Sequence, residues 1–227
     1  MPDPFVVAFV IGVTPTKWAR VWNERMPQLP LELRPCTADE AIAALRDGSV
    51  NAAFLRSAPD DEQQSGLQQI RLYEELPVVV VPKDNDAAAL DSFTPEDLAD
   101  LVILDYAEET AHDTVELVAT NVGVAVMPQS VARSTSRRDV VARPLVGGES
   151  TFVDLAWTDQ TAEVDEFIGI VRGRTANSSR AEDDVPAKKL SASQKAAAKR
   201  ERSGRPAPPE KKKKPQSSRG SARRPKR

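Results

Sequence analysis

The first 55 residues alternate between two hydrophobic periods, and this alternation limits the chain to few folds. Residues 5–13 (FVVAFVIGV) form a continuous apolar run, which is typical of a strand buried on both faces. The start TPTK at residues 14–17 predicts a helix capped by Thr14. The alternating segment LEL at 31–33 and the segment VNAAFL at 50–55 predict two more strands, with a second helix between them. A βαβαβ order implies a parallel sheet covered by helices, so the predicted fold class is α/β.

The second helix carries the clearest local signals. Thr37 followed three residues later by Glu40 is a capping box, and Gly48 is a suitable stop. Between them, apolar residues recur with the i, i+3, i+4, i+7 spacing of one helical face: Ala38, Ala41, Ile42 and Leu45. This apolar face could support a weak homodimer, or it could serve the core of the chain itself.

The strand and helix pattern continues to about Arg172 and then stops. Further strands are expected at residues 76–82, 101–104, 124–127, 140–145 and 151–157, and helical faces at 115–122 and 164–171. Residues 1–171 carry 12 basic and 29 acidic side chains, whereas residues 172–227 carry 19 and 5. The net charge therefore changes from −17 to +14. Residues 180–227 contain only two large aliphatic side chains, so we expect 176–227 to be a disordered basic tail.

Composition excludes several classes of protein. Cys36 is the only cysteine, which rules out an intrachain disulfide and suits a reducing compartment. No apolar run approaches the roughly 20 residues of a membrane helix, and no signal peptide opens the sequence. Motifs of hydrolases, nucleotide-binding loops and metal centres are missing. We therefore expect a soluble, cytoplasmic protein that is not an enzyme and uses no cofactor, metal or membrane.

Five segments resemble, in order and spacing, the effector-binding (substrate-binding) domain of LysR-type transcriptional regulators: residues 40–54, 72–83, 94–99, 115–132 and 154–157. The resemblance implies a two-lobed α/β fold of the type 2 periplasmic-binding-protein kind over residues 1–175. Lobe I would comprise residues 1–80 and 146–175, and lobe II residues 81–145. The helix-turn-helix that normally precedes the domain is not seen. The short stretch between Leu104 and Val115 predicts a shortened second lobe.

In this family a ligand binds in the cleft between the lobes, which implies regulation by a small anionic or polar metabolite. Helix starts and strand ends supply the candidate ligand-binding residues: Thr14, Thr16, Lys17, Arg56, Pro82, Thr110 and Met127. Each candidate has a structural alternative. Arg56 can bind a ligand carboxylate or pair with Asp60 or Asp61. The loop acids are expected to be solvated: Asp105, Glu108, Glu109 and Asp113.

The basic tail suggests a second function. Its charges are clustered without intervening aromatic residues, as in Lys211, Lys212, Lys213, Lys214, Arg223 and Arg224. Such segments bind nucleic acid through phosphate contacts and without base readout. The alternatives are a non-specific nucleic-acid-associated protein, or a solubilising tail that folds back on the acidic part.

Overall fold

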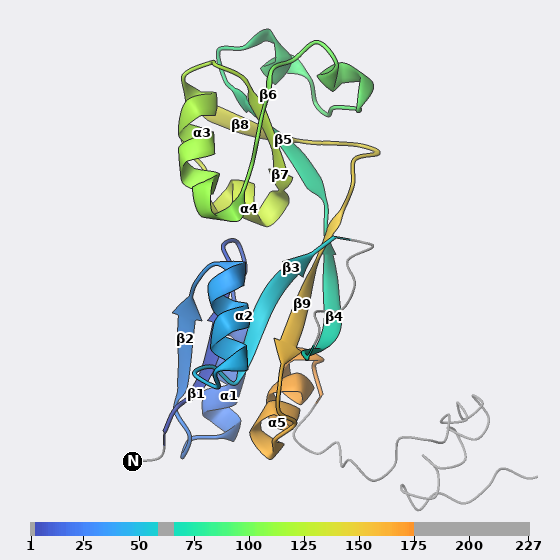
Figure 1. Ribbon diagram of the computed structural model, residues 1–227. Coiled ribbons are helices and arrows are strands. Elements are labelled where there is room, and N and C mark those ends of the chain that lie inside the picture. Colours follow the sequence, from blue (N-terminus) through green and yellow to red (C-terminus); the bar gives the residue numbers. More distant parts are fainter. Residues whose placement is uncertain (1–2, 59–65, 175–227) are drawn as a thin grey trace, which may run out of the picture. The chain divides into compact units, whose positions relative to one another are not determined.

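A computed structural model describes residues 3–58 and 66–174, which form two β-sheets with helices packed on them (Figure 1). The chain divides into two units, Met1–Ser178 and Ser179–Arg227, and every described residue belongs to the first. The first sheet has the order β2-β1-β3-β9-β4: β1 (Phe5–Phe9), β2 (Leu31–Pro35), β3 (Ala52–Ser57), β4 (Gln68–Glu75) and β9 (Thr151–Trp157). The second has the order β6-β7-β5-β8: β5 (Pro77–Pro82), β6 (Ile103–Leu104), β7 (Val124–Pro128) and β8 (Val140–Pro144). The predicted two-lobed α/β fold is confirmed.

Each sheet has its own helices. The first lobe holds α1 (Thr16–Arg25), α2 (Ala38–Arg46) and α5 (Ala162–Val171). The second holds α3 (Ala111–Ala119), α4 (Gln129–Ser134) and three 3-10 turns, η1 (Asp86–Ala89), η2 (Glu96–Leu98) and η3 (Glu108–Thr110). Because η3 is the sole element between β6 and α3 in this described stretch, the second lobe is short there, as expected.

The first sheet begins as the sequence predicts, with β1 paired in parallel to β2 and β3. The strand order reverses direction at β1, so right-handed crossovers place α1 and α2 on opposite faces of the sheet. On the face of α1, Phe5 stacks on Trp22 at 4.5 Å and Trp18 stacks on Phe54 at 4.8 Å. Phe167 of α5 meets the edges of Trp22 and Phe54, which joins α5 to the same aromatic core.

The local signals at the two helix starts had different outcomes. The Thr37 capping box is confirmed: Thr37 Oγ1 accepts from Glu40 N, and Thr37 N donates to Glu40 Oε2. The prediction that Thr14 caps the first helix is wrong. Pro15 is the residue before α1, its carbonyl accepts from Trp18 and Ala19, and no side chain caps this end. The N-cap position is occupied by Pro15, which has no side-chain acceptor, and Thr14 lies one residue too early to cap the helix.

The second sheet is built around β5, which is buried along its whole length. Its valines alternate between the two faces of the sheet. Val78 and Val80 pack with α3 and α4, whereas Val79 and Val81 pack with Phe93 and the side chains of η1 and η2. The core of this lobe is therefore two thin layers, one on each face.

The chain changes sheets at Leu76, between β4 and β5. Residues 77–80 therefore belong to the second sheet, although the sequence-based boundary placed lobe I up to residue 80. The reason is that the apolar run of β5 fits the centre of either sheet, and only its pairing with β7 and β8 decides. The return path runs through residues 145–150 into β9 (Figure 1).

Two other predictions concern the apolar face of α2 and the basic tail. The apolar face of α2 is used within the chain, since Ala41 and Leu45 are buried and Ala38, Ile42 and Ala44 are half-buried against the first-lobe core. The basic tail, with its candidate residues Lys211–Lys214, Arg223 and Arg224, lies outside the described residues. Among the residues that the structure describes, every helix is too short or too polar to cross a bilayer.

Candidate functional site

Arg56 ties the two lobes together. It lies near the carboxyl end of β3, and its side chain is 6% exposed. Within the first lobe, Nε donates to Glu75 Oε2 at 2.7 Å and Nη2 donates to the Ile11 carbonyl at 3.1 Å. Toward the second lobe, Nη1 donates to Glu108 Oε1 and Nη2 donates to Ser130 Oγ at 3.2 Å. The guanidinium is therefore held by two carboxylates of the chain itself.

This arrangement differs from both sequence-based alternatives for Arg56. The first was a carboxylate supplied by a ligand. The second was an ion pair with Asp60 or Asp61, which lie outside the described residues. No sequence pattern indicates that Glu75, 19 residues further on, and Glu108, 52 residues further on, reach the same guanidinium. Whether Glu75 and Glu108 reach Arg56 depends on the order of the strands in the sheet and on the contact between the lobes.

Glu108 corrects the prediction of a solvated acidic loop. Its side chain is 19% exposed, whereas Asp105, Glu109 and Asp113 are exposed as expected. Burial raises the pKa of the Glu108 carboxyl, and the attraction of Arg56 opposes that rise. Glu109 and Glu75 add repulsion. The carboxylates around this single guanidinium therefore outnumber it.

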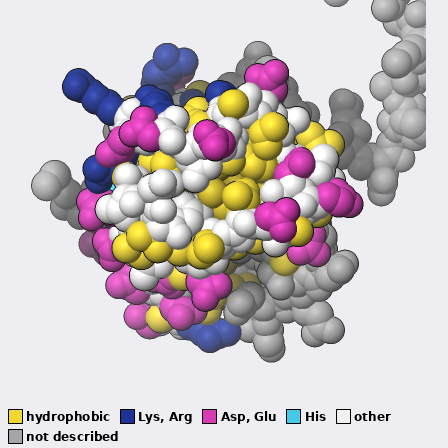
Figure 2. All heavy atoms as spheres, turned by 90° about the horizontal axis from the view of Figure 1, so that it is seen from above, with side chains coloured by type: hydrophobic (Ala, Val, Ile, Leu, Met, Phe, Trp, Pro, Cys, Tyr) yellow, Lys and Arg dark blue, Asp and Glu magenta, His cyan; other side chains and the backbone are white. Residues whose placement is uncertain are grey.

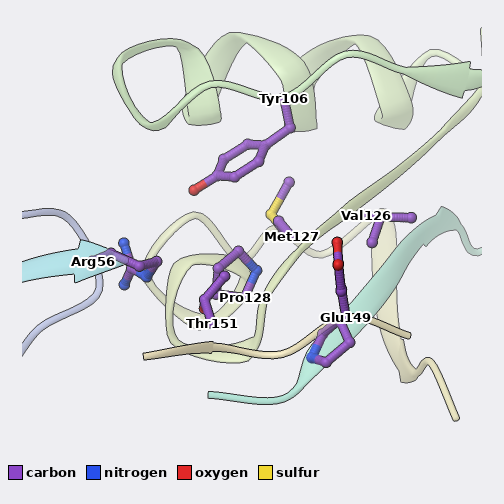
Figure 3. Close-up of a pocket in the computed structure, with 8 residues that line it drawn as sticks. Arg56, Tyr106, Val126, Met127, Pro128, Glu149 and Thr151 are labelled. Atoms are coloured by element: carbon purple, nitrogen blue, oxygen red, sulfur yellow. The ribbon is translucent and has the colours of Figure 1, made fainter. Parts of the chain in front are cut away.

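A cavity of about 190 Å³ lies beside Arg56, between the sheets. Its walls come from both lobes and from the return path: Arg56, Pro77, Tyr106, Val126, Met127, Pro128, Glu149 and Thr151. Figure 3 shows the Tyr106 ring and the Glu149 carboxylate reaching into this space from different sides, with Met127 between them. An engineered cavity of roughly 150 Å³ holds benzene, so this one suits a ligand of similar size.

Three buried oxygens around the cavity have no hydrogen-bond partner among the described residues: Tyr106 Oη, Thr151 Oγ1 and Glu108 Oε2. Tyr106 and Thr151 line the cavity, and Glu108 lies behind Arg56. Burial raises the pKa of the Tyr106 hydroxyl and Glu108 raises it further, so the hydroxyl stays protonated and can donate. Unpaired buried polar atoms are rare in folded proteins and are costly. A polar ligand group beside Tyr106 Oη and Thr151 Oγ1 would satisfy the two of these oxygens that belong to residues lining the cavity.

A second hollow, an open groove of about 540 Å³, lies where the β1–α1 loop faces α4: Phe9, Ile11, Gly12, Val13, Thr14, Pro35, Ser130, Arg133 and Ser134. The lobes approach each other closely there. Gly12 has a φ of +85°, and a Cβ built on it would lie 2.6 Å from Ser130 Oγ. The groove is wide and open, whereas the cavity beside Arg56 is small and lined by unpaired polar atoms.

The structure brings only some of the predicted ligand residues together. Arg56 and Met127 line the cavity, and Thr14 lines the groove. Thr16, Lys17 and Thr110 are exposed, and Lys17 Nζ lies 4.3 Å from the centre of the Trp18 ring. Pro82 lies at the opposite end of β5 from Pro77, about 17 Å away at the usual rise per residue.

Several residues of the site were missed from the sequence: Tyr106, Glu149 and Thr151, which line the cavity, and Glu75 and Glu108, which pair with Arg56. Thr151 stood at the start of the correctly predicted strand β9, which runs antiparallel to β3, so it lies at the sheet edge where β3 ends and where ligands bind in open α/β sheets. That signal could have identified Thr151, but it could not have identified Tyr106 or Glu149, which lie in connecting segments. In the part of the chain that the structure describes, no three His, Cys, Asp or Glu side chains are grouped to hold a metal ion.

Comparison with known proteins gives a consistent result. Residues 11–114 match the family model of the LysR substrate binding domain. The structure is similar to the BenM effector binding domain with its effector benzoate, with a TM-score of 0.62 at 17% identity over 74% of this chain and 90% of that one. It is also similar to the OxyR regulatory domain of Pseudomonas aeruginosa in a mutant form, with a TM-score of 0.60 at 19% identity over 76% and 96%.

The likeness extends to longer proteins, among them full-length BenM and full-length OxyR. Against a mutant of full-length BenM the TM-score is 0.61 at 17% identity, and the match covers 75% of this chain and 66% of that chain. The match thus spans slightly less than two thirds of full-length BenM. No curated protein sequence matches this chain significantly.

Proposed function

Given that this chain carries a substrate-binding domain of the LysR type, we propose that a small-molecule effector binds between its two lobes and that this binding has a regulatory role. The family is regulatory and not enzymatic. The observation that carries the proposal is the cavity beside Arg56, where Tyr106 Oη and Thr151 Oγ1 are buried without partners among the described residues. Of the residues predicted from the sequence, we propose Arg56 and Met127 as ligand neighbours.

Binding at this position would act on the contact between the lobes. Arg56 joins the first lobe to Glu108 and Ser130 of the second, and it also forms part of the cavity wall. A ligand that binds one relative position of the lobes better than another shifts the population toward that position. The regulatory signal is then a change in lobe arrangement, and no bond of the ligand has to break.

A thermal-shift screen of small polar molecules against the full chain tests this proposal. A ligand at about 100 times its Kd should raise the free energy of unfolding by about 2.7 kcal/mol, a shift of several degrees. Val126→Phe places a larger side chain in the cavity and should abolish the shift. Val141→Phe is the matched control, because Val141 is also a half-buried valine of the second sheet but does not line the cavity. If both variants respond like the parent chain, the ligand binds elsewhere.

We propose non-specific nucleic-acid binding by the tail as a second function. The observation in its favour is the change in net charge from −17 over residues 1–171 to +14 over residues 172–227. With about 5–8 phosphate contacts, log affinity for duplex DNA should fall against log salt with a slope of about −5 to −7. Removal of residues 176–227 should abolish binding. Binding by the shortened chain, or a strong preference for one duplex sequence at matched salt, would assign recognition to the folded part instead.

A further inference from the structure

The charge around the cavity defines a class of ligand, and this inference rests on the function proposed above. Arg56 is the sole cationic side chain that lines the cavity, as far as the described residues go. Two of its contacts are the Glu75 and Glu108 carboxylates, and a third carboxylate, Glu149, lines the cavity itself. With all of these groups ionised, the local net charge is −2.

The hydrogen bonds of Arg56 also disfavour an anionic ligand. Its guanidinium makes four hydrogen bonds to described residues, through Nε, Nη1 and twice through Nη2. A single N–H of Nη1 therefore has no partner in that part of the chain. Bidentate recognition of a ligand carboxylate needs two free N–H groups side by side. Such a ligand would first have to displace Glu108 or Glu75.

The rest of the lining suits a cation with a hydrocarbon body. The walls include Pro77, Val126, Met127 and Pro128, which bury apolar surface. The Tyr106 ring reaches into the cavity, and an aromatic face attracts an ammonium group (Figure 3). Thr151 Oγ1 and Tyr106 Oη can accept from N–H donors, and they lack partners among the described residues.

The surface of the second lobe extends this preference beyond the cavity. Residues 76–150 carry 13 acidic and five basic side chains, a net charge of −8. Figure 2 shows acidic side chains distributed around an apolar area on the face that it views. An excess of one sign of charge raises the local concentration of ligands of the opposite sign and repels like charge. Cations are therefore favoured before they reach the cavity.

We propose that the cavity binds a small organic cation, an amine of about benzene size, and not the anionic metabolite that the sequence suggested. Its ammonium would lie near Glu149 and the unpaired hydroxyls, and its hydrocarbon part would contact Tyr106, Met127 and the prolines.

Three probes of equal skeleton and different charge test the proposal on the full chain by calorimetric titration: benzylamine, benzyl alcohol and benzoate. For probes of this size, a Kd on the order of 1 mM is expected, so titration to about 10 mM suffices. We expect benzylamine to bind about tenfold more tightly than the alcohol, and benzoate not to bind. Glu149→Gln should weaken the amine about fivefold, because one of its local charge partners is lost. Glu96→Gln removes an exposed glutamate of the same lobe that does not line the cavity, and it should leave binding unchanged.

The outcomes separate this inference from the function on which it rests. Tighter binding of benzoate, or equal binding of the alcohol and the amine, would overturn the cation class. If Val126→Phe then abolished that binding, effector binding in the cavity would still stand. Loss of amine affinity in Glu96→Gln equal to that in Glu149→Gln would assign the preference to overall charge, which also overturns the proposal. Failure of all three probes to bind would overturn the cation class, and the thermal-shift screen with Val126→Phe would still decide whether the cavity binds another effector.

Discussion

The two lobes have similar architecture but different cores. In the first lobe, large aromatic side chains from β1, β3, α1 and α5 pack into one cluster: Phe5, Trp18, Trp22, Phe54 and Phe167. In the second lobe, the core is mainly valine and alanine, and the sheet divides it into two layers. Since buried apolar area is the main source of folding stability, the first lobe should be the firmer scaffold.

The surface shows the same contrast. Most exposed large apolar side chains belong to the second lobe or its return path: Leu90, Val102, Ile103, Leu117, Val122 and Val146. Its helices α3 and α4 have no side-chain cap; in the first lobe, α2 and α5 are capped by Thr37 and Thr161, and α1 is not capped by a side chain. The lobe that contributes most of the cavity wall is thus the less firmly built one. The proposed ligand cavity is therefore lined mainly by the lobe with the smaller apolar core.

The largest expected effect comes from truncating a buried phenylalanine in each lobe. Phe54→Ala should lower the free energy of unfolding by about 5 kcal/mol, since it leaves a cavity and removes ring contacts with Trp18 and Phe167. Phe93→Ala, equally buried in the second lobe, should lower it by about 3 kcal/mol. Urea unfolding measures both values. Equal losses would remove the distinction between the two cores.

Breaking the tie between the lobes should have the next largest effect. Arg56→Met leaves the buried Glu75 and Glu108 carboxylates without a counter-charge, which should lower the free energy of unfolding by about 3–5 kcal/mol. The control is Arg34→Met, which removes an exposed ion pair with Glu32 and should cost less than about 1 kcal/mol. A mild effect at Arg56 would mean that the lobes do not depend on this contact.

The pH dependence of stability gives a finer test of the same contact. Because the pKa of Glu108 is raised in the folded state, its favourable contribution is full below the ordinary Glu value of about 4.5 and is lost as the pH rises through the folded value. Glu108→Gln should remove this component, so the variant should gain stability relative to the parent as the pH rises from about 4.5 toward neutrality. Thermal unfolding across this range is the measurement. Glu109→Gln, an exposed neighbour, should follow the parent curve more closely; identical curves for all three proteins would contradict the assigned burial.

The smallest expected effect on the free energy of unfolding comes from replacing threonine by alanine at the start of one helix in each lobe. Thr37→Ala removes the cap of α2 and should cost about 1 kcal/mol. Thr110→Ala, at the start of α3, should cost less than about 0.5 kcal/mol, because its hydroxyl caps nothing and donates to the Ala107 carbonyl. Chemical denaturation resolves the difference. A larger loss at Thr110 would show that the second lobe depends on its helix start more than its geometry indicates.

Features encoded within a short stretch of sequence were predicted well. The capping box at Thr37 and Glu40 uses residues three apart, and the alternating pattern of residues 151–157 gave the bounds of β9. The two lobes followed from the order of such segments and from the family resemblance. The failed cap at Thr14 was also local, but the choice there depended on a loop whose shape is set by contact with the second lobe.

The site was predicted less well because its contacts are long-range. Arg56 was selected correctly as a strand-end residue, yet its partners Glu75 and Glu108 become neighbours only through β4 and through the meeting of the lobes. An acidic residue in a polar loop is usually solvated, and nothing in the sequence around Glu108 distinguishes it from Glu109. Charge balance in a cavity is a sum over such contacts, and the carboxylates near this cavity, Glu75, Glu108 and Glu149, come from segments far apart in the sequence.

Gly12 of the first lobe lies in close contact with Ser130 of the second lobe. At this position the backbone has a positive φ, and the atom that any other residue would add meets Ser130 Oγ at 2.6 Å. The two lobes can approach this closely because glycine has no Cβ. An alanine here would press against Ser130, next to the point where Arg56 Nη2 donates to both the Ile11 carbonyl and Ser130 Oγ. The spacing of the two lobes at this contact is therefore set by the absence of a side chain at residue 12.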